Sequence, residues 1–123
     1  MFHVLLVGAG GALGAMGRYG LSLLPWRGDF PLLTLCTNLL GAVLIGFIVG
    51  LADQGQLSPG GTLFWKTGVC GGFTTFSTFS LESLTLLQKG KWLPGGSYMA
   101  LSLGLCLAGV LLGRRLSALA RGQ

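Results

Sequence analysis

Charged residues are scarce in this chain. Only 9% of its 123 residues are Asp, Glu, Lys or Arg, against about 25% in an ordinary soluble domain. A compact domain of this size leaves much of its area facing water, and eight basic and three acidic residues are too few to cover it. Because 51% of the residues are hydrophobic, the sequence favours a lipid bilayer over water as the surroundings.

Cysteine and histidine are also few. Cys36, Cys70 and Cys106 are isolated within apolar segments and odd in number, so they indicate neither a disulfide framework nor a metal site. His3 is the only histidine and has no ligand partner nearby. The basic residues occur singly or in pairs at the ends of apolar runs, which argues against a nucleic-acid partner. We expect neither an enzyme nor a nucleic-acid-binding protein.

Glycine, by contrast, is abundant. The chain has 23 glycines, where about 7% of residues is usual, and they follow no collagen-like period. Small residues let helix backbones approach closely in a bilayer. Pairs at the matching four-residue spacing are Gly10/Gly14, Gly46/Gly50, Gly68/Gly72 and Gly109/Gly113.

Four apolar runs reach the length of about 20 residues that crosses the hydrocarbon core. They cover residues 4–24, 30–51, 62–87 and 93–112, separated by loop-forming residues. We therefore predict an all-α membrane protein, a single domain over residues 1–123 with four transmembrane helices, in the cell membrane.

The basic residues do not choose an orientation for these spans. Those outside the spans divide three against three, with Arg114, Arg115 and Arg121 on one side and Arg27, Lys89 and Lys91 on the other. Adding Lys66 and Arg18 keeps the balance. Since the positive-inside rule selects neither orientation, we expect a dual-topology antiparallel homodimer. Orientation by a partner or by details of insertion is the alternative.

The third span is unlike the others, because residues 68–80 combine glycines, hydroxyls and aromatics. Gly71 and Gly72 lower helix propensity, and hydroxyl side chains compete for backbone groups, so we predict a break here. Free carbonyls at a break suit a small hard cation. The alternative is an unbroken helix whose Ser and Thr bond to their own turn.

After such a break, Phe76 and Phe79 would share one helix face, and Thr74 and Thr78 another. Two such rings commonly serve packing alone. However, the edge of an aromatic ring is electropositive, so rings held edge-on can also attract a dehydrated anion.

Polar side chains in the spans are mainly hydrogen-bond donors, and they form no acidic ring of the kind that selects cations. This favours an anion pathway, although the same groups could act only as interhelical glue. The donors are Thr34, Asn38, Ser77, Thr78, Tyr98 and Ser102. Arg18 either reaches the interface or gives a vestibule positive potential. Glu82 is interpreted as an interfacial residue; the alternative is that it lines an exit path by pairing with donors.

The segment from Gly68 to Glu82 resembles the signature of the Fluc (CrcB) fluoride channels. Support comes from the first span, Gly10 to Tyr19, and the second, Thr34 to Gly41. The resemblance implies a dual-topology dimer with two antiparallel fluoride pores and a structural sodium ion at its centre.

Residue by residue, the resemblance implies that the carbonyls of Gly71 and Thr74 hold this Na⁺. It implies pore positions at Asn38, Phe76, Phe79, Ser77, Thr78, Tyr98 and Ser102, and a basic vestibule residue at Arg18. Thr34 joins the pore set as a donor one turn before Asn38. Ala42 departs from the serine common in the family.

The expected function is passive export of cytoplasmic fluoride, which reduces fluoride toxicity. The alternative is a dual-topology drug exporter, which needs a carboxylate in its substrate cavity, and the first two spans contain none. A nucleotide-binding enzyme is suggested by the glycine-rich run after Val4, with Asp29 further on, but Leu13 occupies the third glycine position. A non-conducting assembly protein remains open from the sequence pattern alone.

Overall fold

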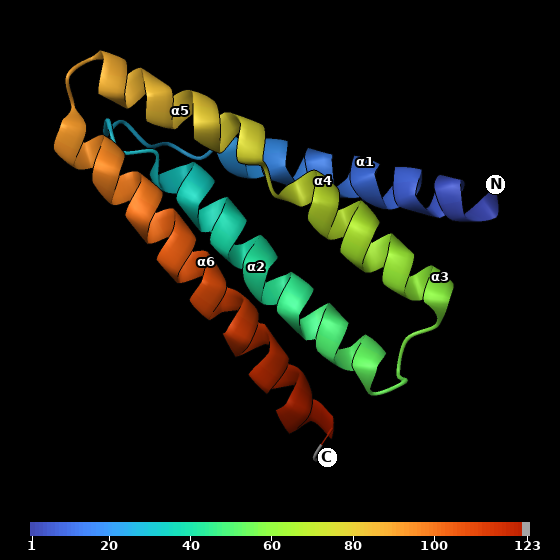
Figure 1. Cartoon of the computed structure of the whole chain (residues 1–123). Coiled ribbons are helices and arrows are strands. Elements are labelled where there is room, and N and C mark those ends of the chain that lie inside the picture. The colour runs from blue at the N-terminus through green and yellow to red at the C-terminus, as the bar shows by residue number, and fades with distance from the viewer. Residues whose placement is uncertain (122–123) are drawn as a thin grey trace.

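The computed structural model describes residues 1–121, and in that range the chain forms helices joined by loops (Figure 1). The elements are α1 (Phe2–Ser22), α2 (Leu32–Asp53), α3 (Pro59–Thr62), the π-helix η1 (Leu63–Cys70), α4 (Gly71–Phe73), α5 (Phe76–Gln88) and α6 (Trp92–Arg121). The C-terminal limit of the predicted domain, residue 123, lies outside the described residues.

Three of these helices, α1, α2 and α6, are long and apolar enough to cross a membrane. The predicted spans 4–24 and 30–51 agree with α1 and α2 to within two residues at each end. The predicted third span is divided among four shorter elements, from α3 to α5. The all-α membrane architecture is confirmed at this level.

The helices pack as two pairs (Figure 1). α2 lies along α6, and α1 lies along η1 and α4, with far fewer contacts between the pairs. Glycines allow the close approach within each pair, as their spacing predicts. A Cβ added to Gly46 or Gly113 would meet the backbone of the facing helix, at the carbonyls of Val110 and Val43.

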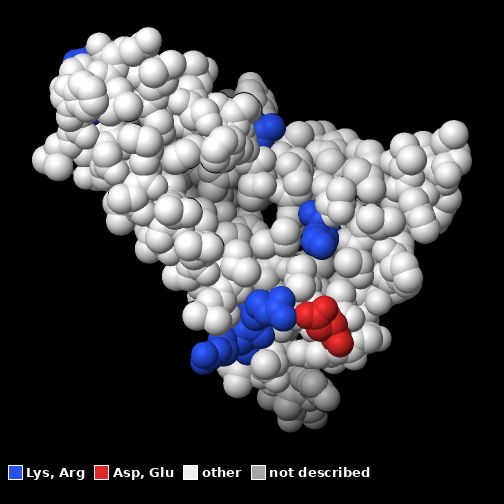
Figure 2. All heavy atoms as spheres, in the orientation of Figure 1, with Lys and Arg blue, Asp and Glu red and all other residues white. Residues whose placement is uncertain are grey.

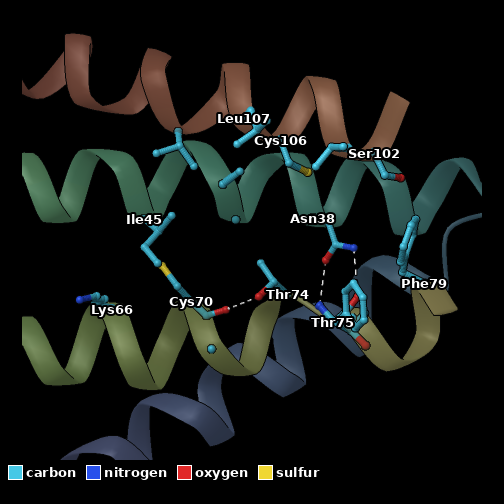
Figure 3. A pocket seen from close by; sticks show the side chains of 16 residues that line it. Asn38, Ile45, Lys66, Cys70, Thr74, Thr75, Phe79, Ser102, Cys106 and Leu107 are labelled. Carbon is cyan, nitrogen blue, oxygen red and sulfur yellow. Dashed lines mark hydrogen bonds between the residues drawn. The ribbon is translucent and has the colours of Figure 1, made fainter. Parts of the chain in front are cut away.

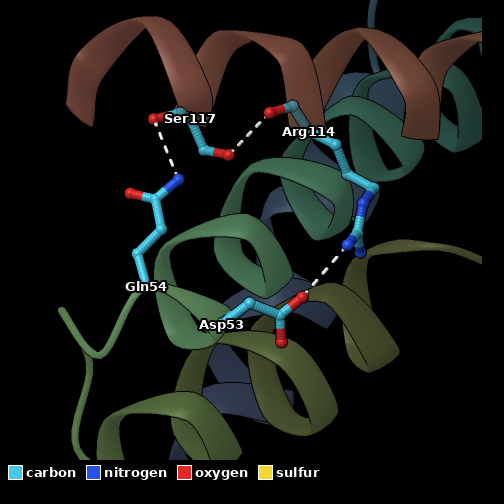
Figure 4. Close-up of polar contacts among 4 residues, drawn as sticks. All are labelled: Asp53, Gln54, Arg114 and Ser117. Carbon is cyan, nitrogen blue, oxygen red and sulfur yellow. Dashed lines mark hydrogen bonds and ion pairs between the residues drawn. The ribbon is translucent and has the colours of Figure 1, made fainter. Parts of the chain in front are cut away.

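The helix α6 continues to Arg121, beyond residue 112, where the predicted fourth span ends. Polar contacts hold this extension against the end of α2 (Figure 4). Arg114 pairs with Asp53 at 3.0 Å, and Gln54 Nε2 donates to the Ser117 carbonyl at 3.4 Å. The helix therefore extends past the predicted span and includes the charged residues Arg114 and Arg115.

Large apolar side chains cover much of the outside. Phe76 is 78% exposed, and leucines such as Leu5, Leu40 and Leu103 are more than half exposed on their helices. Charged atoms are sparse on the face shown in Figure 2, and acidic atoms there gather beside basic ones near the end of α6. A surface of this kind is suited to lipid or to a second protein chain.

Candidate functional site

The third span changes direction at Thr74 and Thr75, between α4 and α5. Both residues are extended, with ψ of 158° and 120°. The Asn38 side chain reaches across from α2 and bonds the Thr75 backbone twice (Figure 3): its Nδ2 donates to the carbonyl at 3.1 Å, and its Oδ1 accepts from the N–H at 2.8 Å. Thr75 Oγ1 in turn accepts from the Thr78 N–H at 3.1 Å and caps α5.

This geometry withdraws helical donors from two carbonyls. The Thr75 N–H donates to Asn38 Oδ1 rather than to the Gly71 carbonyl four residues before it. The Thr78 N–H donates to Thr75 Oγ1, where an unbroken helix would direct it at the Thr74 carbonyl. Main-chain oxygens freed in this way are the ligands that a small hard cation prefers. The donor chemistry at Gly71 and Thr74, the residues predicted to hold Na⁺, fits that ion.

A groove of about 440 Å³ runs beside this turn, between α2 and α6 on one side and η1 on the other. Figure 3 shows its two walls facing each other, with Ser102 and Asn38 near one end and Lys66 near the other. Most of its wall is apolar, including Ile45, Leu107 and Val110. It brings together six of the predicted site residues: Asn38, Gly71, Thr74, Phe76, Phe79 and Ser102.

Aromatic rings form a continuous row from the groove into the protein. The centroids of Phe76 and Phe79 are 5.5 Å apart, and those of Phe79 and Tyr98 are 5.1 Å apart. Tyr98 is fully buried and also meets Phe30 edge-on at 5.6 Å. The row begins at the most exposed of these rings, Phe76, and ends at a buried hydroxyl.

That hydroxyl donates to Glu82. Tyr98 Oη lies 2.9 Å from Oε1 of Glu82, and Thr34 Oγ1 lies 3.1 Å from Oε2, so both carboxylate oxygens accept a bond. The sequence predicts Thr34 and Tyr98 as donors to an anion, and in the structure both hydroxyls donate to the Glu82 carboxylate. The pairing of Glu82 with donors agrees with the alternative interpretation of this residue and not with the preferred, interfacial one. A lone carboxylate in an apolar span, one turn after Thr78, was the available signal.

The other predicted site residues lie outside the groove. Arg18 Nε donates to the Gly72 carbonyl at 3.1 Å, which ties α1 to α4. Ser77 is exposed and lies 3.3 Å from the Thr75 hydroxyl. Thr78 is half-buried at the start of α5.

Ser102 is unusual among the groove residues because it is only 7% exposed and its Oγ has no hydrogen-bond partner among the described residues. Ser83 in α5 shares this condition at 5% exposure, but it does not line the groove. Buried hydroxyls without partners are uncommon, since each carries a desolvation cost. The Ser102 hydroxyl therefore keeps an unused hydrogen-bonding capacity beside the groove.

The sequence of this chain is similar to those of known proteins. Residues 5–114 match the family described as CrcB-like protein, Camphor Resistance (CrcB). The chain belongs to the CrcB-like family. A relative named fluoride-specific ion channel FluC from Ruminiclostridium cellulolyticum is 44% identical over 95% of this chain and 93% of its own length. Relatives of the same name from Rhizobium meliloti (45%, 92% of this chain and 94% of the relative) and Chlorobium phaeobacteroides (50%, 78% and 77%) are also similar.

Membership in the CrcB-like family decides two questions that composition raised. The chain is a multi-pass membrane protein and not an enzyme. The glycine-rich run after Val4 accordingly lies within α1, a helix long enough to cross a membrane, and not in a strand and phosphate loop. The nucleotide-binding alternative is therefore wrong.

Proposed function

We propose that two copies of this chain associate antiparallel in a membrane and form a fluoride-specific channel that lets cytoplasmic fluoride leave the cell passively. The observation that carries this proposal is the similarity, over nearly the whole chain, to relatives named for fluoride conduction. The residues at the groove provide the chemistry that such a channel needs.

Antiparallel pairing is supported by the balanced basic residues and by the groove. Phe76 lines the apolar groove of the protomer and is 78% exposed. A second copy would cover this ring and close the groove. Because neither orientation is favoured by the loops, both forms would be inserted and available to pair.

The ion would pass along donors and ring edges. In this proposal the Ser102 hydroxyl, which has no other partner among the described residues, donates to fluoride inside the groove. The edges of Phe76 and Phe79 supply positive electrostatic potential where water is lost. Asn38 keeps one amide hydrogen beyond the one that it donates to Thr75. Beyond these groups, Tyr98, Thr34 and Glu82 form a hydrogen-bonded chain that leads outward.

A structural sodium ion at the dimer centre is part of the same proposal. In the proposed dimer the Gly71 and Thr74 carbonyls would face the shared interface, and the N–H groups that would bond them in an unbroken helix are bonded elsewhere. Two copies would offer four such oxygens. The ion would supply positive charge that holds the two extended turns together, and it would not itself be transported.

Passive conduction of fluoride is enough to protect the cell from fluoride. Undissociated HF enters from acidic surroundings and ionises inside, and a negative interior potential then drives the anion outward through an open pathway. No coupled energy source is required.

Fluoride release from liposomes containing the purified protein, followed with a fluoride electrode, tests the function. Phe76→Ile should abolish rapid release, because it removes the ring edge but keeps an apolar side chain. Phe2→Ile is the matched control, since Phe2 is also well exposed at 69% and lies at the start of α1, away from the groove.

Release of fluoride but not chloride, lost only in Phe76→Ile, would support the channel. No release from folded wild-type protein would refute it. Proton-coupled uptake of an organic cation by the same vesicles would instead favour the exporter.

A further inference from the structure

A second cavity, distinct from the groove, lies beside the loops that precede α2 and follow α5. It has a volume of about 420 Å³ and is more polar than the groove. Thr34 and Glu82 line it, so it adjoins the hydrogen-bonded chain described above. Lys89, Lys91 and Asp29 line it as well, from the two loops that connect α1 with α2 and α5 with α6.

These two loops are joined by one ion pair. The Lys91 ammonium contacts the Asp29 carboxylate, and no other ion pair involves either loop within residues 1–121. The loop around Asp29 has a defined shape, because Trp26 Nε1 donates to the Phe30 carbonyl at 2.7 Å. The Phe30 ring meets Tyr98 edge-on. The Asp29 carboxylate is thus held at the rim, one residue from a ring that packs against the buried tyrosine.

The charged residues that line the cavity balance one another. Lys89 and Lys91 contribute two positive charges, and Asp29 and Glu82 contribute two negative ones. Hydrogen bonding to Lys91 holds the pKa of Asp29 below its usual range, so that carboxylate stays ionised at neutral pH. Lys91 and Asp29 are 36% and 66% exposed, and a pair this exposed contributes little to stability. Its charges do act on ions, since a cavity with low-dielectric walls focuses the field of the groups that line it.

We propose that this cavity is the mouth of the fluoride pathway and that the Lys91–Asp29 pair sets its electrostatic potential. The pair thereby sets the rate at which fluoride passes between solution and the Tyr98–Glu82–Thr34 chain. The proposal rests on the proposed channel function and assigns rate control to two loop residues that do not line the groove. Asp29 limits the attraction that Lys89 and Lys91 would otherwise exert.

Opposite charge changes then have opposite effects. Asp29→Asn leaves the mouth with one net positive charge and should raise fluoride release. Lys91→Gln leaves one net negative charge and should lower it. The double variant, Asp29→Asn with Lys91→Gln, restores neutrality and should return release to near the wild-type rate. For one charge about 7 Å from the ion in a water-like medium, the expected change is roughly two- to threefold.

The experiment measures fluoride release from liposomes at about 20 mM and about 300 mM salt. Each effect should shrink at the higher salt, where the Debye length is shorter. Lys91→Arg keeps the charge and should match wild type. Asp53→Asn breaks the other exposed ion pair, with Arg114 at the far end of α2, and should change the rate by much less. Asp53 does not line the cavity.

Opposite signs, restoration in the double variant and salt sensitivity would establish the proposal. Loss of release in all three variants, independent of salt, would mean that the pair only holds the two loops together. Release at the wild-type rate in all three variants would mean that the charge at the mouth is irrelevant. Either result overturns this proposal while leaving the channel intact. A rise in Asp53→Asn equal to that in Asp29→Asn would also overturn it. Absence of release from wild-type protein would refute the channel itself, and this inference with it.

Discussion

Asn38 bonds the Thr75 backbone at both its N–H and its carbonyl, at 2.8 and 3.1 Å. One amide on α2 therefore substitutes for the two hydrogen bonds that an extended residue in the third span would otherwise lack. The turn between α4 and α5 depends on a residue 37 positions away, and the direction of Phe76 depends on the turn.

Replacing this amide should loosen the turn. Asn38→Leu leaves the Thr75 N–H and carbonyl without partners, and each unpaired half-buried group costs roughly 1–3 kcal/mol. We expect a lower thermal unfolding temperature in detergent and loss of fluoride release. Gln54→Leu is the matched control, because that amide makes one longer bond, 3.4 Å, near a helix end, and it should change stability by less than about 0.5 kcal/mol. Equal effects of the two variants would show that the Asn38–Thr75 hydrogen bonds are unimportant for stability.

The Glu82 carboxylate should be energetically coupled to Tyr98. Glu82→Gln replaces one acceptor oxygen with a donor, and Tyr98→Phe removes a donor directed at that carboxylate. Once one partner is absent, removing the other should cost less. A double-variant cycle on fluoride release should therefore give a coupling of about 0.5–3 kcal/mol. Tyr19→Phe is the control, since Tyr19 is 66% exposed, and its cycle with Glu82→Gln should be additive.

Close packing of α2 against α6 predicts opposite results for two glycines in α6. A Cβ at Gly113 would meet the Val43 carbonyl and the Phe47 nitrogen, whereas a Cβ at Gly104 would meet nothing within 4 Å. Gly113→Ala should destabilise the protein by about 1–3 kcal/mol through overpacking. Gly104→Ala should stabilise it by up to about 1 kcal/mol, because alanine favours the helix. Thermal unfolding of the two variants under identical detergent conditions measures both.

Side-by-side comparison of α2 and the third span explains what the sequence could predict. Length and apolar content alone define α2, so its ends were predicted to within two residues. For the third span, glycine propensity indicated weakness at Gly71 and Gly72. Gly71 is helical in the structure, with φ −61° and ψ −38°, and the extended residues are Thr74 and Thr75. Local propensity identified the region, but a contact from another helix decides the residue.

The sequence left the donors that pair with Glu82 unidentified for a related reason. The sequence gives the i, i+4 spacing of donors within one span, but not which faces of two spans meet. Thr34 and Tyr98 come from α2 and α6, and their hydroxyls converge on a carboxylate of α5 only because these helices cross there. Periodicity predicts the polar faces, and helix packing decides their partners.

Sodium dependence can be tested by ion replacement, since the proposed ligands are main-chain carbonyls that no side-chain substitution removes. Replacing Na⁺ by a bulky organic cation on both sides of the liposome should lower fluoride release and the thermal stability of the proposed dimer. K⁺ is the informative control, because it has the same charge and a larger radius, and it should not fully restore either quantity. Full fluoride release without Na⁺ would argue against a structural Na⁺ at these carbonyls.

Ser102 and Ser83 provide the sharpest separation of ion contact from structural role. Both hydroxyls are buried and lack partners among the described residues, so replacing either by alanine removes a desolvation cost and should stabilise the protomer by about 1 kcal/mol. Only Ser102 lines the groove.

Ser102→Ala should therefore raise the unfolding temperature and lower fluoride release, because the donor to the ion is lost. Ser83→Ala should raise stability by a similar amount and leave release unchanged. Thermal unfolding in detergent and fluoride-electrode recordings on the same preparations measure both quantities. Unchanged release in Ser102→Ala would remove this hydroxyl from the pathway, and reduced release in both variants would show that packing near α6, rather than contact with the ion, limits conduction.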